Sequence, residues 1–152
     1  MQLLRQSTDW KAISIVGLCR RAGVARASFY EHYRGKADLL DDLFAVRLAS
    51  ITGTSRAGSP LATLEWLAAH VAEAPRFFAS AMAGGRGDTL LPRFRLALTG
   101  KLTEELTLRK VADAGRVSAY LIGGSMAYLA ATPDADAARS LQRLATRVIR
   151  KS

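Results

Sequence analysis

The stretch from Ser14 to Lys36 constrains the fold more than any other part of the chain. Behind Ser14, a residue that can cap a helix N-terminus, apolar residues recur at helical spacing on one face: Ile15, Leu18, Cys19 and Ala22. Gly23 follows where a helix often ends in a left-handed residue, a conformation that costs glycine little. The pattern predicts a first short helix that ends at this glycine.

A second short helix is predicted after Val24. Phe29 and Tyr33 lie four residues apart on one face and suit a small core. The polar residues predicted to face outward are Arg26, Ser28, Glu31 and His32. Two helices joined by a glycine-containing turn form a helix-turn-helix, whose second helix can enter a DNA major groove. Other small αα-corners share this spacing, so the residue identities matter more than the spacing.

Those identities resemble a known family. The residues that carry the resemblance are Ala22-Gly23-Val24, Arg26, Ser28-Phe29-Tyr30, His32-Tyr33 and Lys36-Ala37-Asp38-Leu39-Leu40. The run is similar to the TetR family of bacterial one-component regulators, whose pattern is roughly A-G-V-x-x-x-[ST]-[LF]-Y-x-H-[FY]-x-x-K-x-x-L. The resemblance covers about the first third of the chain. It implies an all-α protein with a three-helix DNA-binding head and a helical body for ligand binding and dimerisation.

The resemblance also implies which residues meet DNA. Arg26 can bond guanine O6 and N7 or hold a phosphate, and Ser28 can reach a base edge or a phosphate. Tyr30 and His32 resemble the family's backbone-contacting pair, and Lys36 can meet a phosphate at the start of the next helix. The full set expected at DNA is Ser14, Arg26, Ala27, Ser28, Tyr30, His32 and Lys36.

Two positions, Ala25 and Val16, depart from the family pattern. Two further side chains, Glu31 and His32, are considered for base recognition and for metal binding. Ala25 gives up the usual side-chain cap of the second helix, and Val16 stands where many relatives have a polar residue that touches DNA. Glu31 can accept from a cytosine amino group but fits a solvated charge better. No second His, Cys or carboxylate stands at ligand spacing from His32, so neither a metal nor a cofactor is expected.

Composition limits the remaining possibilities. The chain has 152 residues, 49% of them hydrophobic, and four prolines, which favours a packed helical protein. One cysteine excludes an internal disulfide framework, and no signal peptide or membrane-spanning run is visible, so a cytoplasmic protein is expected. The net charge of +9 suits a polyanionic partner such as DNA. Residues 1–50 carry eight Lys/Arg against five Asp/Glu, and the remainder fourteen against eight, so the charge is spread out.

The domain prediction places the DNA-binding head at residues 1–51 and the helical body at 59–152, with the break in the Gly/Ser/Thr-rich run between them. Residues 1–12 form a stub in which the family's first helix looks truncated. Trp10 fits a plug over the head core better than a nucleic-acid stacking residue. A helix from Lys36 is expected to end near Ser50 or Ile51, and Pro60 is expected in the first turn of the next helix behind Ser59 as its cap.

Later helices are predicted from Pro75, from about Thr89 or Pro92, over 110–131 and over 135–150. From Val117 to Ala131 the helix over 110–131 is almost entirely apolar, which requires cover on several sides. The resemblance implies that the last two helices form a homodimer. In the final helix, Ala138, Leu141, Leu144, Ala145 and Val148 are predicted to face inward, opposite a row of arginines.

A DNA-binding transcriptional repressor that responds to a small molecule is the function the resemblance implies. Candidates for an effector pocket are Trp66, His70, Phe78, Met82, Phe94 and Tyr120, with core packing as the simpler role for each. A dimeric DNA-binding module without a sensor stays open as an alternative. A helical enzyme or carrier is the least supported class, because no catalytic triad, carboxylate pair or metal constellation is visible.

Overall fold

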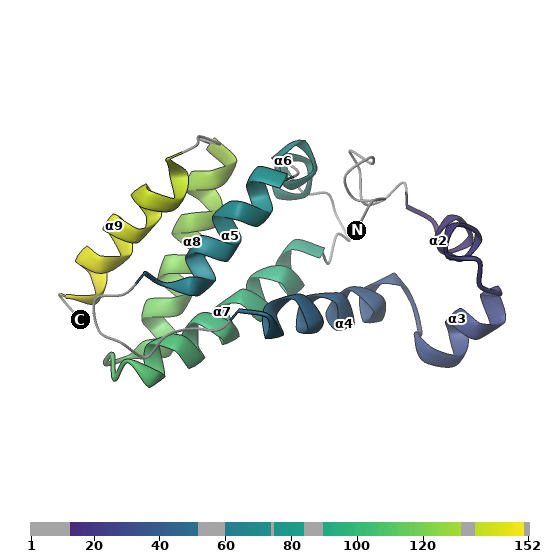
Figure 1. Cartoon of the computed structure of the whole chain (residues 1–152), viewed down its shortest axis with the longest axis horizontal. Helices are drawn as coiled ribbons and strands as arrows, with labels where there is room; N and C mark the ends of the chain where they lie inside the picture. Colours follow the sequence, from purple (N-terminus) through teal and green to yellow (C-terminus); the bar gives the residue numbers. More distant parts are fainter. Residues whose placement is uncertain (1–12, 52–59, 74, 84–89, 132–135, 151–152) are drawn as a thin grey trace.

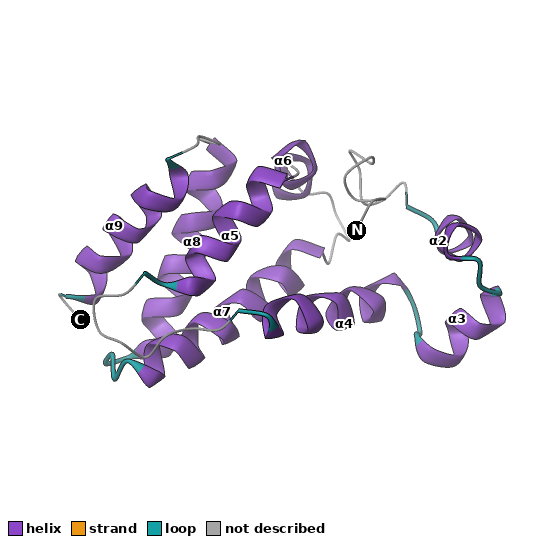
Figure 2. Cartoon of the chain, viewed as in Figure 1, coloured by secondary structure: helices purple, strands orange, loops and turns teal. Residues whose placement is uncertain are grey.

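The computed structural model describes residues 13–51, 60–73, 75–83, 90–131 and 136–150. These residues form helices joined by turns (Figure 2). The helices are α2 (Ile15–Ala22), α3 (Arg26–His32), α4 (Lys36–Ala49), α5 (Ala62–Glu73), α6 (Pro75–Ala83), α7 (Leu90–Leu108), α8 (Ala114–Ala131) and α9 (Ala137–Ile149). The predicted all-α fold is confirmed. Within the described ranges, no helix combines the length and apolar content needed to cross a membrane.

The helix α4 connects a small head to a larger body. α2 and α3 lie beyond the N-terminal end of α4, at the opposite end of the molecule from α9 (Figure 1). α4 itself packs along α7: Leu40 is buried with Leu90, and Phe44 contacts Phe94 with ring centroids 5.0 Å apart. An Arg93–Asp41 ion pair also joins the two helices. The helix predicted from Lys36 ends at Ala49, close to the expected end. Most of its packing is with the body, on α7.

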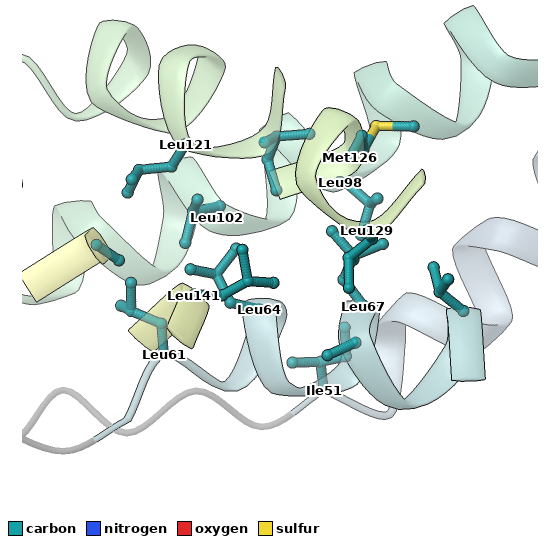
Figure 3. Packing of buried hydrophobic residues seen from close by; sticks show 14 of the residues in the cluster. Ile51, Leu61, Leu64, Leu67, Leu98, Leu102, Leu121, Met126, Leu129 and Leu141 are labelled. Carbon is teal, nitrogen blue, oxygen red and sulfur yellow. The ribbon is translucent and has the colours of Figure 1, made fainter. Parts of the chain in front are cut away.

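One hydrophobic core runs through the body. It is built from the apolar stripes of α5, α7, α8 and α9 and the end of α4, and Figure 3 shows its centre. Leu64, Leu98 and Leu102 are fully buried there. The inner residues predicted for α5 are all buried: Leu61, Leu64, Leu67, Ala68 and Val71. The helical period in the sequence identified this face correctly.

Buried polar side chains fix the start of α5. Glu105 of α7 accepts hydrogen bonds from the backbone N–H groups of Ala62 (2.9 Å) and Thr63 (3.1 Å) and from the Thr63 hydroxyl (2.9 Å). Gln142 of α9 both donates to and accepts from the backbone of Leu61, at 2.8 Å each. Free N–H groups at a helix start need such acceptors. Pro60 lies before the helix and not in its first turn, and the predicted cap Ser59 lies outside the described residues.

Two predicted boundaries in the body were wrong. α8 begins at Ala114 and not at Lys110, because Lys110 (φ 58°) and Asp113 (φ 47°) adopt positive φ angles that end α7 and turn the chain. α9 begins two residues later than expected, at Ala137. Its Leu144, predicted to face inward, is 48% exposed. The buried stripe of α9 is narrower than predicted because α9 lies on one side of the body, where it packs mainly against α5 and α8.

Candidate DNA interface

The first helix of the head is capped at both ends by its own sequence. The Ser14 hydroxyl accepts a hydrogen bond from the Gly17 N–H at 3.0 Å. At the other end Gly23 has φ 69° and ψ 26°, its N–H donates to Arg20 O, and the Val24 N–H donates to Cys19 O at 3.0 Å. This pair of hydrogen bonds is a Schellman motif, which a left-handed residue permits. The predicted cap and glycine turn are confirmed, and they set the angle at which α3 leaves α2.

α3 presents most of its circumference to solvent. Phe29 is buried and packs against Tyr33, with ring centroids 5.4 Å apart, and this pair fixes the helix from one side. The helix residues predicted to meet DNA are all exposed: Arg26, Ala27, Ser28, Tyr30 and His32. Ala25 makes no side-chain cap, as expected of an alanine. The exposed polar groups of α3 lie on two sides of the helix, because residues four apart share a face and residues two apart do not. Arg26 and Tyr30 lie on one side, and Ser28 and His32 lie on another, where they also line the hollow between the head helices.

Lys36 forms a hydrogen bond within the head. Its Nζ donates to the backbone carbonyl of Ile13 at 2.6 Å, which ties the start of α4 to the residue before α2. Asp38, in the first turn of α4, accepts from the Arg34 N–H at 3.0 Å and ties this turn to the residues before the helix. Lys36 is thus a structural link in the head as well as a predicted DNA contact.

An apolar hollow of about 580 Å³ lies between the head helices. The residues that line it include Leu18, Cys19, Phe29, Tyr33 and Leu39. Cys19 is buried, so its thiol packs as a small apolar group. Residues 1–12, including the predicted stub helix and Trp10, lie outside the described residues.

Basic side chains on the head extend the predicted set. Arg20 and Arg21 are exposed in the last turn of α2, and Arg34 is exposed between α3 and α4. These three were not predicted, because cations in the last turn of a helix are also expected from the helix dipole alone. The Arg-Arg pair directly before the turn glycine was the signal available. Together with Arg26 they give the exposed end of the molecule a cationic surface.

Comparison with known proteins supports this arrangement. Residues 7–43 match the family model described as bacterial regulatory proteins, tetR family. The matched residues carry the DNA-binding domain of the TetR family. No curated protein and no solved structure matches it.

A TetR regulator is a DNA-binding transcriptional regulator, and the matched residues are those of the helix-turn-helix. The match ends within α4, so it covers the head and the start of the helix that joins head to body. The matched range includes all of α2 and α3.

The effector candidates occupy different places in the body. Trp66 and His70 of α5 stack with ring centroids 4.6 Å apart and planes 10° apart, and Phe94 of α7 lies 6.3 Å and 5.9 Å from them. Phe44 of α4 adjoins Phe94, and these four rings are called the aromatic cluster below. Phe78 is buried in the body core and Met82 packs against it. Tyr120 is 69% exposed on α8.

Burial affects the titration of His70 in this cluster. Desolvation lowers its pKa below the ordinary 6.5; Glu73 opposes the shift and Arg47 adds to it. The imidazole is therefore held in its neutral form, in which it stacks on Trp66 without the cost of a buried charge.

Proposed function

We propose that this TetR regulator is a repressor that acts in the cytoplasm as a homodimer, without catalytic activity, on a roughly palindromic operator. The exposed side of α3 carries the proposal: Arg26 and Tyr30 lie one helical turn apart and are both exposed, while the buried Phe29 anchors the helix. In a dimer, two such helices would enter successive major grooves about 34 Å apart. Repression follows if the occupied site overlaps a promoter.

Footprinting of the pure protein on the DNA that flanks its own gene tests this proposal. The expected result is a protected site with two half-sites about one helical turn apart. Random duplex DNA of the same length is the control. Binding to the flanking DNA no tighter than to random duplex would leave the repressor proposal without support.

We further propose that a small effector acts at the aromatic cluster. Phe44 belongs to the helix that joins the head, whereas Trp66, His70 and Phe94 belong to the body. A ligand that parts these rings would move α4 relative to α5 and α7 and so change the separation of the two heads. It must bind one head separation better than the other, since a ligand with equal affinity for both shifts nothing.

A module that dimerises without sensing is the second candidate, and the packing of the same cluster favours it. Rings in direct contact fill the space that a ligand needs. The two candidates are separated by titrating the operator complex with the small-molecule fraction of a cell extract. Release of DNA supports the sensor, and retention of DNA at every extract concentration supports the module.

A further inference from the structure

The aromatic cluster joins three helices through a continuous series of ring contacts. His70 of α5 stacks on Trp66, and its ring centroid lies 5.9 Å from that of Phe94 on α7. Phe94 in turn lies 5.0 Å from Phe44 on α4. Because α4 is the helix that begins at the head (Figure 1), a change at His70 can reach the head through two ring contacts.

A proton is an effector that needs no cavity in this cluster. Rings in direct contact must part before a molecule can enter between them, whereas a proton binds to an imidazole nitrogen in place. His70 is half-buried, so water can deliver the proton. Histidine is also the side chain whose ordinary pKa lies closest to neutral pH, and His70 is one of two histidines in the chain.

The surroundings of His70 oppose its positive charge and make that charge act on α4. Burial is the main reason why the pKa of His70 lies below 6.5; Glu73 on the same helix raises it, and Arg47 of α4 lowers it further. On α7, the uncharged Phe94 faces His70, and the neighbouring Arg93 takes part in an ion pair. An imidazolium would therefore be drawn toward Glu73 on its own helix and repelled by Arg47 on α4.

We propose that His70 is a proton-operated switch: protonation of its imidazole opens the aromatic cluster and releases α4 from the body. A released α4 lets the head take up many positions, of which a bound operator fits only a few. The affinity for operator DNA then falls with the fraction of molecules in the fitting position. The inference rests on the proposed operator-binding function and names the proton as a signal that controls it.

Fluorescence of Trp66 tests the opening of the cluster without DNA. The chain has two tryptophans, so the measurement uses a Trp10→Phe variant, in which Trp66 is the remaining one. Its emission is expected to move to longer wavelength between pH 7 and pH 5, because the indole gains contact with water, and the added change His70→Phe should abolish this shift. Far-UV circular dichroism should stay constant over the same range.

Two results of this titration would overturn the switch. One is emission that keeps its wavelength, as expected if the imidazolium stays stacked as a cation over the indole face. The other is a loss of helix over the same pH range, because the shift would then report unfolding of the chain.

Operator affinity tests whether the opened cluster affects the head. For the DNA segment protected in footprinting, the dissociation constant is expected to be at least about fivefold higher at pH 5 than at pH 7, the lower end of ordinary coupling between two sites. His70→Phe should lose this difference. His32→Gln is the matched control: it removes the other histidine of the chain and should keep the fivefold ratio, whatever its affinity at pH 7. The same ratio in His70→Phe as in the wild type would rule out the switch.

Arg47→Leu separates a switch from a merely structural role. Arg47 is exposed, so the variant is expected to fold. Without this charge the pKa of His70 should rise, and the Trp66 shift should therefore occur at higher pH. The repulsion that drives α4 away is also lost, so the ratio of dissociation constants should become smaller. An unchanged midpoint together with an unchanged ratio would contradict the mechanism.

Failure of the switch and failure of the proposed function give different results. A Trp66 shift in a chain that binds the flanking DNA no better than random duplex would overturn the operator proposal and support the opening of the cluster. A wild-type chain that binds its operator equally well at pH 7 and pH 5 would overturn the switch and leave the repressor proposal intact.

Discussion

Glu105 is a buried carboxylate, whereas the other acids in the described parts of the chain are exposed or half-buried. It pairs with Arg109 at 2.8 Å, and Arg109 donates in turn to the backbone carbonyl of Pro60 at 2.8 Å. The same carboxylate accepts the first N–H groups of α5. One side chain therefore holds together the end of α7 and the start of α5, which lie more than forty residues apart in the sequence.

Replacing Glu105 should be costly. Glu105→Ala leaves a buried guanidinium without its carboxylate partner and the first N–H groups of α5 without their acceptor, so the free energy of unfolding should fall by about 3–5 kcal/mol. Glu104→Ala is the control, because its exposed ion pair with Lys101 should contribute less than about 1 kcal/mol. Urea denaturation of both variants measures the difference. An equal fall in the two variants would contradict the role given to Glu105.

His70 should make stability depend on pH. Burial holds its pKa in the folded chain below the unfolded value of 6.5. The stability it contributes is therefore fully present above pH 6.5 and is lost as pH falls through the folded pKa. His70→Phe should remove this loss and flatten the curve of unfolding free energy against pH between 7 and 5. His32→Gln, on the exposed side of α3, serves as the control and should keep the wild-type curve.

At the scale of elements, α4 is the helix that contacts both the head and the body. Its N-terminal residue Lys36 bonds to Ile13 of the head, and Leu48 and the following Ile51 enter the body core. A shift of α4 against α7 would therefore move α3 directly. The domain boundary predicted between 51 and 59 falls after this helix, in a segment outside the described residues, and stays a prediction.

The angle between α2 and α3 depends on one glycine. Gly23→Ala forces a side chain into φ 69°, which should cost roughly 1–2 kcal/mol and loosen the head, although a Cβ there meets open space. Gly35→Ala is the control: its φ of 178° is extended backbone that any residue adopts, and a Cβ there also meets open space. Hydrogen exchange of α2 and α3 amides should speed up in the first variant only. Equal exchange in both would show that the left-handed residue does not limit head stability.

At the scale of the whole molecule, the proposed homodimer would double every DNA contact. Arg26→Ala should remove one cation from each head. If each of these cations neutralises one phosphate, the slope of log affinity against log salt should become shallower by roughly 0.9 per head, or about 1.8 per dimer. If Arg26 instead reads a base, operator preference should relax. Filter binding of operator and random duplexes across a salt series measures both quantities.

Tyr30→Ala should weaken binding to all sequences alike and leave the salt slope unchanged, because a phenol carries no charge. The same salt series on operator and random duplexes measures this effect, with Arg26→Ala as the comparison that does change the slope. A Tyr30→Ala variant with wild-type affinity for every duplex would remove Tyr30 from the interface.

Which structural features the sequence predicts depends on how far apart in the chain the interacting residues lie. Helix positions, the capping of α2 by Ser14, the left-handed Gly23 and the exposed side of α3 were all predicted, because each depends on residues within a few positions of one another. Boundaries near Lys110 and Asp113 were missed, since positive φ angles at residues other than glycine carry little local signal.

The sequence by itself determined an all-α chain with a helix-turn-helix head, since period, caps and turn residues are local. The tertiary structure decided which helix supplies the cap of α5, which rings gather around Phe94, and that Lys36 bonds to Ile13. It also decided that Leu96 and Tyr120 stay exposed although both are large side chains. These features depend on residues brought together from distant parts of the chain, and only the packing of the helices brings them together.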